Sequence, residues 1–380
     1  MTKEDLFGDE LERRSPSASG PPPDDARGIP GGTVEDGPTP DHGDDDMNRR
    51  AALQVIAALG AGTAIPPGAF ESVLSGIDGS VSESATPLRP HWEEAAWEYS
   101  QTIWVKPTGA LAQDLTWDLA SIGATLGKNL PEAHRKNLLR VGAQLSAYLA
   151  QELSDLGNLR AARRAFQSAI GAAEASGDQE LIIWVHAYNA ARAACEGRPA
   201  ALVDSLLGEA IGRAGPAPSV GLATALQTQA ESRAAQGDSA GAEESLARLR
   251  GVFEKLSSPT TGDHITPWGW PEEYLRFTES LSYAMLGKTR QANTAIDRAL
   301  ELSPLEREGT RTNLQLMRPI VLVREGEIAE GLERAVAAVQ GVPGSTARRR
   351  VAGEIIRALP DPQARALPAA RELRALTVTA

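Results

Sequence analysis

The chain has very little cysteine and few aromatic residues, and both shortages narrow the class of protein that it can be. Its single cysteine, Cys195, excludes an intramolecular disulfide, so the fold is not a disulfide-stapled scaffold. Aromatic residues make up only 4% of the 380 residues and runs of β-branched residues are scarce, whereas alanine and leucine are abundant. Because this mixture favours helices over strands, we expect a helical fold with a core drawn from the 42% of hydrophobic residues.

An excess of basic residues is also missing. The net charge is −12, and residues 1–46 hold 13 acidic and 4 basic residues, so most of the acidity belongs to the N-terminal segment. The rest of the chain is nearly neutral, which argues against a basic surface for nucleic acid. We therefore expect no direct nucleic-acid binding.

The motifs of common catalytic and metal sites are absent as well. The five histidines are scattered, none has a second histidine or a cysteine at metal-ligand spacing, and neither an HExxH nor a GxSxG motif occurs. The segment LGKT at 286–289 resembles the end of a phosphate-binding loop, but Ser282 stands where that loop needs a glycine. The sequence therefore predicts no catalytic residue, no metal and no cofactor, and an enzyme is the least favoured class.

Composition divides the chain into three segments. Residues 1–46 are rich in proline, glycine, serine and acidic residues and contain almost nothing to bury, so they are predicted to be a disordered acidic tail. Residues 47–87 contain an apolar linker helix followed by a flexible Ser/Gly-rich link. Residues 88–376 have the periodicity of one helix after another and form the predicted folded domain.

The segment MNRRAALQVIAALGAGTAI at 47–65 has the order of a twin-arginine export signal. Its apolar core is shorter than the about twenty residues of a membrane span, so no stable span is expected. Because a long polar segment precedes it, we favour a linker helix that docks by Leu53, Ile56 and Leu59, in a cytoplasmic protein. If translation began at Met47, the segment would be a good export signal, and the alternative is an exported binding or scaffold protein with the same fold.

An internal repeat is the strongest signal in the sequence. In three units a small residue follows a turn glycine by five positions, and a larger apolar residue comes four positions later. The small residue lets two antiparallel helices approach closely, and the larger one fills the groove between them. The turn glycines, with gaps of 40, 40, 50 and 39 residues, are Gly157, Gly197, Gly237, Gly287 and Gly326. The small and large residues are Ala162 with Phe166, Ala242 with Leu246, and Ala292 with Ile296.

These offsets resemble those of tetratricopeptide repeats. The unit around Gly287, preceded by Tyr283, is the best match, although the units are longer than the usual repeat of about 34 residues. The resemblance covers residues 140–345. We therefore predict an all-α fold in which antiparallel helix pairs stack into a right-handed superhelix, a tetratricopeptide-like α-solenoid.

In such a solenoid the first helix of each pair faces the concave side, and the repeat offsets place a set of amides, acids and aromatics there. Amides can bond to the backbone of an extended peptide and aromatic rings give rigid contact area, so this face is the predicted binding site. The alternative is that the aromatic members belong to the core between repeats. The predicted concave residues are Gln144, Gln151, Trp184, Gln227, Glu231, Tyr274, Phe277 and Asn313.

The longest gap between glycines contains a polar, Pro/Gly-rich insertion, SSPTTGDHITPWGWPEEYLR. It presents Trp268 and Trp270 before Pro271 starts the next helix. A loop at this junction can fold over the groove as a lid. Packing of the two tryptophans against neighbouring helices is the equally weighted alternative.

Several segments resemble a known family, among them HWEEAAWEY, WVHAYNAARAACEGRP and above all GWPEEYLRFTESLSYAMLGKTRQANTAIDRALELSP. They look like the tetratricopeptide-like sensor half of actinomycete (Streptomyces-type) transcriptional regulators of the Xre helix-turn-helix family. Residues 1–46 have no amphipathic pattern for a helix-turn-helix, so DNA binding is not carried over. The resemblance implies a non-enzymatic sensor or interaction protein in transcriptional regulation or signalling. Its candidate partners are a peptide, a small ligand, a partner protein such as a DNA-binding regulator, or a second copy of the chain in a homodimer.

Overall fold

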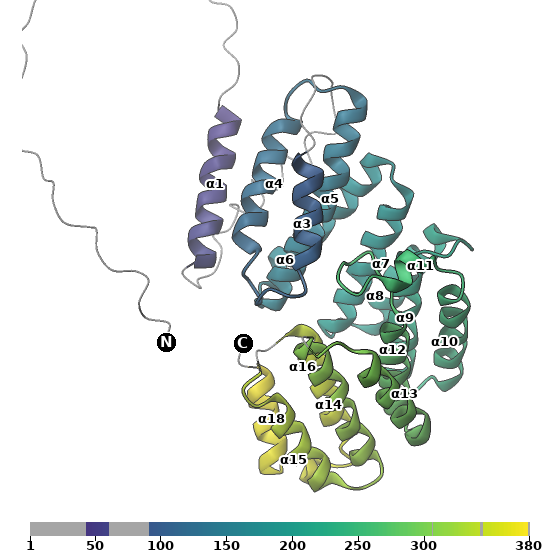
Figure 1. The fold of residues 1–380 in the computed structure, drawn as a ribbon. Coiled ribbons are helices and arrows are strands. Elements are labelled where there is room, and N and C mark those ends of the chain that lie inside the picture. Colours follow the sequence, from purple (N-terminus) through teal and green to yellow (C-terminus); the bar gives the residue numbers. More distant parts are fainter. Residues whose placement is uncertain (1–42, 61–90, 306, 343–344, 379–380) are drawn as a thin grey trace, which may run out of the picture. The chain divides into compact units, whose positions relative to one another are not determined.

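The computed structural model describes residues 43–60, 91–305, 307–342 and 345–378. These residues form 17 helices and no strand, which confirms the predicted all-α fold (Figure 1). The predicted disordered tail over residues 1–42 and the predicted link over residues 61–87 lie outside the description. The handedness of the helix array stays a prediction.

Ten of the helices form five antiparallel pairs, each joined by a short glycine turn, and a sixth pair ends the array. The first helix of each pair contacts the first helix of the next pair, and we call these six helices the inner helices. The inner helices are α5 (Glu132–Asp155), α7 (Gln179–Cys195), α9 (Val220–Ala235), α12 (Glu272–Met285), α14 (Glu308–Arg324) and α16 (Thr346–Ala358). Their partners are α6 (Leu159–Ser176), α8 (Ala200–Ala214), α10 (Ser239–Phe253), α13 (Thr289–Leu302), α15 (Ile328–Val339) and α18 (Pro368–Val378). The short helices α11 (Ser258–Gly262) and α17 (Pro362–Arg365) lie in connecting segments.

The five predicted turn glycines all end an inner helix in the same way. Their φ angles lie between 69° and 94°, in the left-handed region that only glycine adopts without strain. In each turn the N–H of the following residue donates to the carbonyl five residues earlier, over 2.8 to 3.1 Å. This bond satisfies a carbonyl that would otherwise be unpaired at the helix end. The repeat seen in the sequence is therefore a repeated helix C-terminus.

The small and large residues after each turn lie between the paired helices, as the spacing predicts. Ala162, Ala242 and Ala292 are fully buried, and their larger partners are buried as well. In the fifth pair the same position is Gly331, where an added Cβ would lie 2.9 Å from a methyl group of Val323. Small side chains at this position therefore keep the two helices of a pair close together.

Among the described residues, three helices precede the repeat pairs. The helices α3 (His91–Thr102) and α4 (Ala112–Leu126) contact α5, and the Tyr99 hydroxyl donates to Asp118 of α4 over 2.7 Å. The helix α1 (Gly43–Gly60) begins inside the segment predicted as tail, where three consecutive aspartates favour a helix N-terminus. The structure describes no helix that is long and apolar enough to span a membrane.

The face of α1 that packs on α4 differs from the predicted one. Ala51, Val55 and Ala58 are buried and share one side of the helix, whereas Leu53 is 56% exposed and Ile56 is half-buried. Leu59 lies outside the described side chains. The prediction of docking by Leu53 is wrong, because small residues allow a closer approach of the two helices than the larger side chains of the opposite face.

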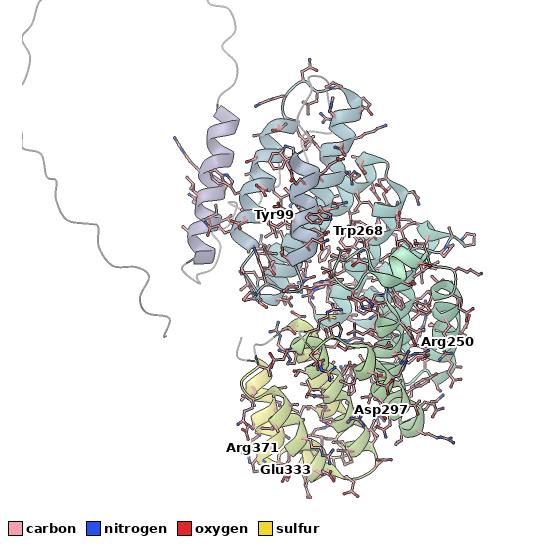
Figure 2. The ribbon with its side chains drawn as sticks, in the orientation of Figure 1. Tyr99, Arg250, Trp268, Asp297, Glu333 and Arg371 are labelled. Carbon is pink, nitrogen blue, oxygen red and sulfur yellow. The ribbon has the colours of Figure 1, made fainter. Side chains whose placement is uncertain are left out.

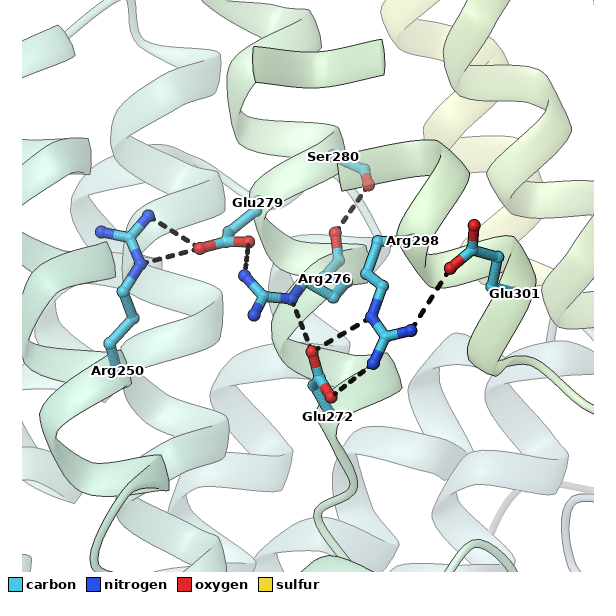
Figure 3. A network of polar contacts seen from close by, with 7 residues as sticks. All are labelled: Arg250, Glu272, Arg276, Glu279, Ser280, Arg298 and Glu301. Carbon is cyan, nitrogen blue, oxygen red and sulfur yellow. Dashed lines mark hydrogen bonds and ion pairs between the residues drawn. The ribbon is translucent and has the colours of Figure 1, made fainter. Parts of the chain in front are cut away.

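The helices on the two sides of the insertion, α10 and α12, are joined by a polar network (Figure 3). Glu279 of α12 joins Arg250 of α10 at 2.7 Å and Arg276 of its own helix at 2.8 Å. Glu272, at the start of α12, meets Arg276 at 3.0 Å and Arg298 of α13 at 3.2 Å. The network therefore links three helices at the one repeat junction that the insertion lengthens.

Candidate functional site

The inner helices surround a cavity of about 680 Å³. This volume lies within the range of roughly 300–1,000 Å³ that small-molecule pockets occupy. All six inner helices contribute to its wall, together with the loop that contains Trp104 and the loop that contains Trp270. Side-chain caps fix the starts of three of these helices, α7, α9 and α16. At each start a side-chain oxygen accepts a hydrogen bond from the backbone N–H three residues later; the capping residues are Asp178, Ser219 and Ser345.

Seven of the eight predicted concave residues line this cavity. They come from five inner helices and are Gln151, Trp184, Gln227, Glu231, Tyr274, Phe277 and Asn313. Gln144 does not reach it, because it lies two turns before Gln151 on the long helix α5, about 10 Å along the axis. The structure therefore brings most of the predicted set together, while ligand binding by these residues stays a prediction.

Trp184 is the centre of an aromatic stack. Its ring lies between Tyr188, with centroids 4.9 Å apart, and Trp268, at 4.7 Å. Its indole N–H donates to the Pro267 carbonyl over 3.1 Å, and only 2% of the residue is exposed. Trp184 therefore anchors the insertion loop (Trp268 is labelled in Figure 2) and has little surface left for a ligand.

Trp270 and Trp104 form a second aromatic group around Tyr274. Trp270 is 1% exposed and meets the edge of Tyr274 at 6.1 Å, and its backbone N–H donates to Thr260 over 2.9 Å. The Arg307 guanidinium lies over Trp104 at 5.7 Å and over Tyr274 at 5.6 Å, in cation–π contact. The predicted lid loop is thus packed into the wall of the cavity, and its opening as a lid stays a prediction.

The buried charges around the cavity are paired across helices. Asp155 of α5 accepts from Arg192 of α7 over 2.8 Å and from the backbone N–H of Thr346 over 3.0 Å. Burial opposes ionisation of Asp155, but Arg192 and Thr346 outweigh it and hold the pKa of Asp155 below its usual value. Glu231 of α9 pairs with Arg350 of α16. These contacts tie the last inner helix to the first ones.

Glu152 lies one turn before Asp155 and behaves in the opposite way. It is 3% exposed and accepts from the Leu111 N–H over 3.2 Å. Burial raises the pKa of Glu152 to about 7 and the neighbouring Asp155 adds to the shift, because the backbone N–H groups of Leu111 and Gly109 and the more distant Arg192 do not offset the loss of hydration. The cavity wall therefore carries a carboxyl group that titrates near neutrality.

No pattern in the sequence pointed to the arginines or to the first loop of the site. Arg307, Arg348 and Arg350 line the cavity, as do Trp104 and the cysteine of α7. Trp104 precedes the recognised repeats, so no repeat offset pointed to it. Arg348 and Arg350 belong to a run of three arginines in α16, and Arg350 is largely buried beside Glu231. A clue lay in the apolar residues that follow these arginines on the same helix, since a fully solvated helix needs none.

No family model, no curated protein and no solved structure matches the chain. Among the residues that the structure describes, no three side chains of His, Cys, Asp or Glu are grouped to hold a metal ion. The class that the fold itself defines is an all-α array of helix pairs around a central cavity.

Proposed function

We propose that the chain is a non-enzymatic helical-repeat sensor or interaction protein that binds a ligand in the cavity between its inner helices. The ligand is a small molecule, a short peptide or a segment of a partner protein. The observation that carries the proposal is the convergence of seven predicted concave residues, from five different helices, on one cavity.

The chemistry of the wall supports binding rather than turnover. Asp155, Glu231, Arg307 and Arg350 are engaged in ion pairs between helices that stabilise the array, whereas Glu152 lies outside these pairs. Amide and aromatic side chains provide the orienting contacts that binding pockets use. By resemblance to actinomycete sensor domains, we place the protein in transcriptional regulation or signalling, with a DNA-binding regulator among its candidate partners.

A cavity-filling variant tests this function. Thr224 of α9 lines the cavity and is half-buried, so Thr224→Phe places a ring in the ligand space without removing a charge. We expect native mass spectrometry of the protein from its natural cells to show a bound species that Thr224→Phe loses. Thr294→Phe, on the exposed face of α13, is the control and should keep it. If the wild type carries no bound species, or if the wild type and Thr224→Phe carry it equally, the cavity is not the binding site.

We propose a cytoplasmic location, with export by the twin-arginine route as the alternative. The burial of Val55 of α1 in contact with the folded array supports a linker helix, because a cleaved signal would be lost from the fold. Fractionation with a C-terminal epitope separates the two. Full-length protein confined to the cytoplasm agrees with the proposal, and a shortened form outside the membrane contradicts it.

A further inference from the structure

The charges around the cavity leave little unmatched charge for a ligand. Three buried carboxylates each meet a guanidinium, in the pairs Asp155–Arg192, Glu231–Arg350 and Glu273–Arg307. Burial lowers the pKa of Arg348, the nearby Glu308 opposes this shift, and Arg348 donates to the Gly309 carbonyl over 3.4 Å, while Lys106 is exposed to solvent. Glu152 is largely protonated below its pKa of about 7. A charged ligand group buried here would lose its hydration without gaining a free partner, at a cost of several kcal/mol.

Two neutral polar side chains of the wall have bonding capacity left. The Asn313 Oδ1 is buried and has no hydrogen-bond partner, and the residue is only 8% exposed. Gln151, also 8% exposed, makes no side-chain hydrogen bond to any residue that the structure describes. A buried polar atom without a partner is rare in native proteins. Because the Asn313 Oδ1 has almost no accessible surface, the Asn313 side chain must rotate before a ligand in the cavity can supply the missing bond.

One aromatic ring of the cavity is also left without a ring partner. Phe277 is half-buried on α12, between α9 and α14, whereas Trp184, Tyr188 and Tyr274 are all engaged in ring contacts. No ring contact to Phe277 occurs within the described part of the chain. Phe277 and Asn313 lie on neighbouring inner helices, and both residues line the cavity.

We infer that the cavity binds an uncharged aromatic amide. Its ring packs on Phe277, the Asn313 side chain rotates so that its Oδ1 accepts from an amide N–H of the ligand, and Gln151 bonds to the ligand's remaining amide groups. The inference rests on the proposed function, since it names the chemical class that the same cavity takes. Both a small molecule and an internal stretch of a peptide offer this chemistry.

Three probes that share one indole ring test the class. N-acetyltryptophanamide is uncharged, N-acetyltryptophan is an anion and tryptophanamide is a cation at about pH 6, where Glu152 is protonated. Isothermal titration of the full chain should give at least about tenfold tighter binding of the uncharged probe than of either charged one. Equal or tighter binding of a charged probe overturns the inference, and so does failure of all three to bind.

A matched pair of variants locates the contact. Gln151→Leu should weaken binding of N-acetyltryptophanamide severalfold, as should Asn313→Leu. Gln144→Leu is the control, since Gln144 lies on the same helix with the same 8% exposure but outside the cavity, and its affinity should match the wild type. Circular dichroism confirms that each variant is folded. Loss of affinity in the control as well, or in none of the three, contradicts the assigned contacts.

A further arm separates the two sources of the ligand. The probe is a blocked tripeptide with alanine on both sides of tryptophan. If it binds at least as tightly as N-acetyltryptophanamide, the natural ligand is assigned to a peptide segment. Weaker binding assigns it to a small molecule. Failure of the amide class leaves the proposed function standing if the natural protein still carries a species that Thr224→Phe loses, so the two outcomes are distinguishable.

Discussion

At the residue scale, two carboxyl groups three positions apart on α5 show how partners decide ionisation. Both are buried, but Asp155 has a guanidinium at 2.8 Å and a backbone N–H at 3.0 Å, whereas Glu152 has one N–H at 3.2 Å. Burial raises the pKa of Glu152 to about 7, while its partners lower that of Asp155. The two groups should therefore give opposite dependences of stability on pH.

Glu152→Gln tests the first of these dependences. The folded pKa of about 7 lies above the ordinary value, so wild-type stability falls as the pH rises from about 4.5 to 7, and the amide abolishes this loss. The free energy of unfolding of the variant minus that of the wild type should therefore increase by about 1–3 kcal/mol from about pH 4 to pH 8. Urea unfolding at several pH values measures it, and parallel curves for the two proteins would refute the raised pKa.

Asp155→Asn is the contrasting neighbour. The depressed pKa of Asp155 contributes stability above its unfolded pKa, and this stability is lost as the pH falls through the folded pKa. The variant also leaves Arg192 buried without its anion. We expect it to lose about 3–5 kcal/mol near neutral pH, with a smaller deficit in acid. A deficit that grows as the pH falls would contradict the pairing.

At the element scale, the approach of α9 to α7 depends on one glycine. A Cβ at Gly221 would lie 2.6 Å from Ile183 Cγ2 and 2.7 Å from the backbone nitrogen of Trp184. Backbone atoms cannot rotate away as a flexible side chain can. The two helices, which both line the cavity, can therefore lie this close only because position 221 has no side chain.

Gly221→Ala should destabilise the protein by about 1–3 kcal/mol, because it forces the two helices apart. Gly208→Ala is the matched control: it is an exposed glycine within α8 with nothing within 4 Å of the added Cβ. Alanine there should instead stabilise the helix by about 0.5–1 kcal/mol. Thermal melts of both variants measure the two signs, and equal shifts would mean that α7 and α9 do not meet at Gly221.

At the scale of the whole molecule, α16 returns to the beginning of the repeat array. The Thr346 hydroxyl donates to the Ser154 carbonyl over 3.2 Å, between residues 192 positions apart, and Arg350 pairs with Glu231, 119 positions away. A simple stack of repeats needs contacts only between neighbouring units. The added contacts join the sixth inner helix to α5 and α9 across the cavity.

Arg350→Met tests how much the contacts of α16 with the earlier inner helices stabilise the protein. It leaves Glu231 buried without a cation, so we expect a loss of about 3–5 kcal/mol and faster hydrogen exchange in α16. The double variant Glu231→Gln with Arg350→Met should recover much of the loss. Arg334→Met removes an exposed pair on α15 and should change stability by less than about 0.5 kcal/mol. Equal effects of Arg334→Met and Arg350→Met would show that the α16 contact is not a buried pair.

Local patterns predicted the helix pairs and seven of the residues that line the cavity. Gly287 and Ala292 were readable because a turn and the groove behind it involve residues a few positions apart, and Tyr274 and Asn313 followed from the repeat offset. Gln144 failed because the offset gives the face of a helix and not the height along it. Leu53 failed because hydrophobicity alone does not say which face of α1 meets a neighbour with room only for small side chains.

The sequence by itself determined an all-helical chain of paired helices, since each pair is specified by hydrogen bonds and packing within about forty residues. Only the tertiary structure decided that α16 closes on α5 and α9, and that the charges of the cavity cancel in pairs. Arg350 and Glu231 are far apart in the chain and belong to no common period, so no pattern in the sequence records their contact. The repeat thus determines the helix pairs, and the contacts of α16 with α5 and α9 determine how the charges of the site are paired.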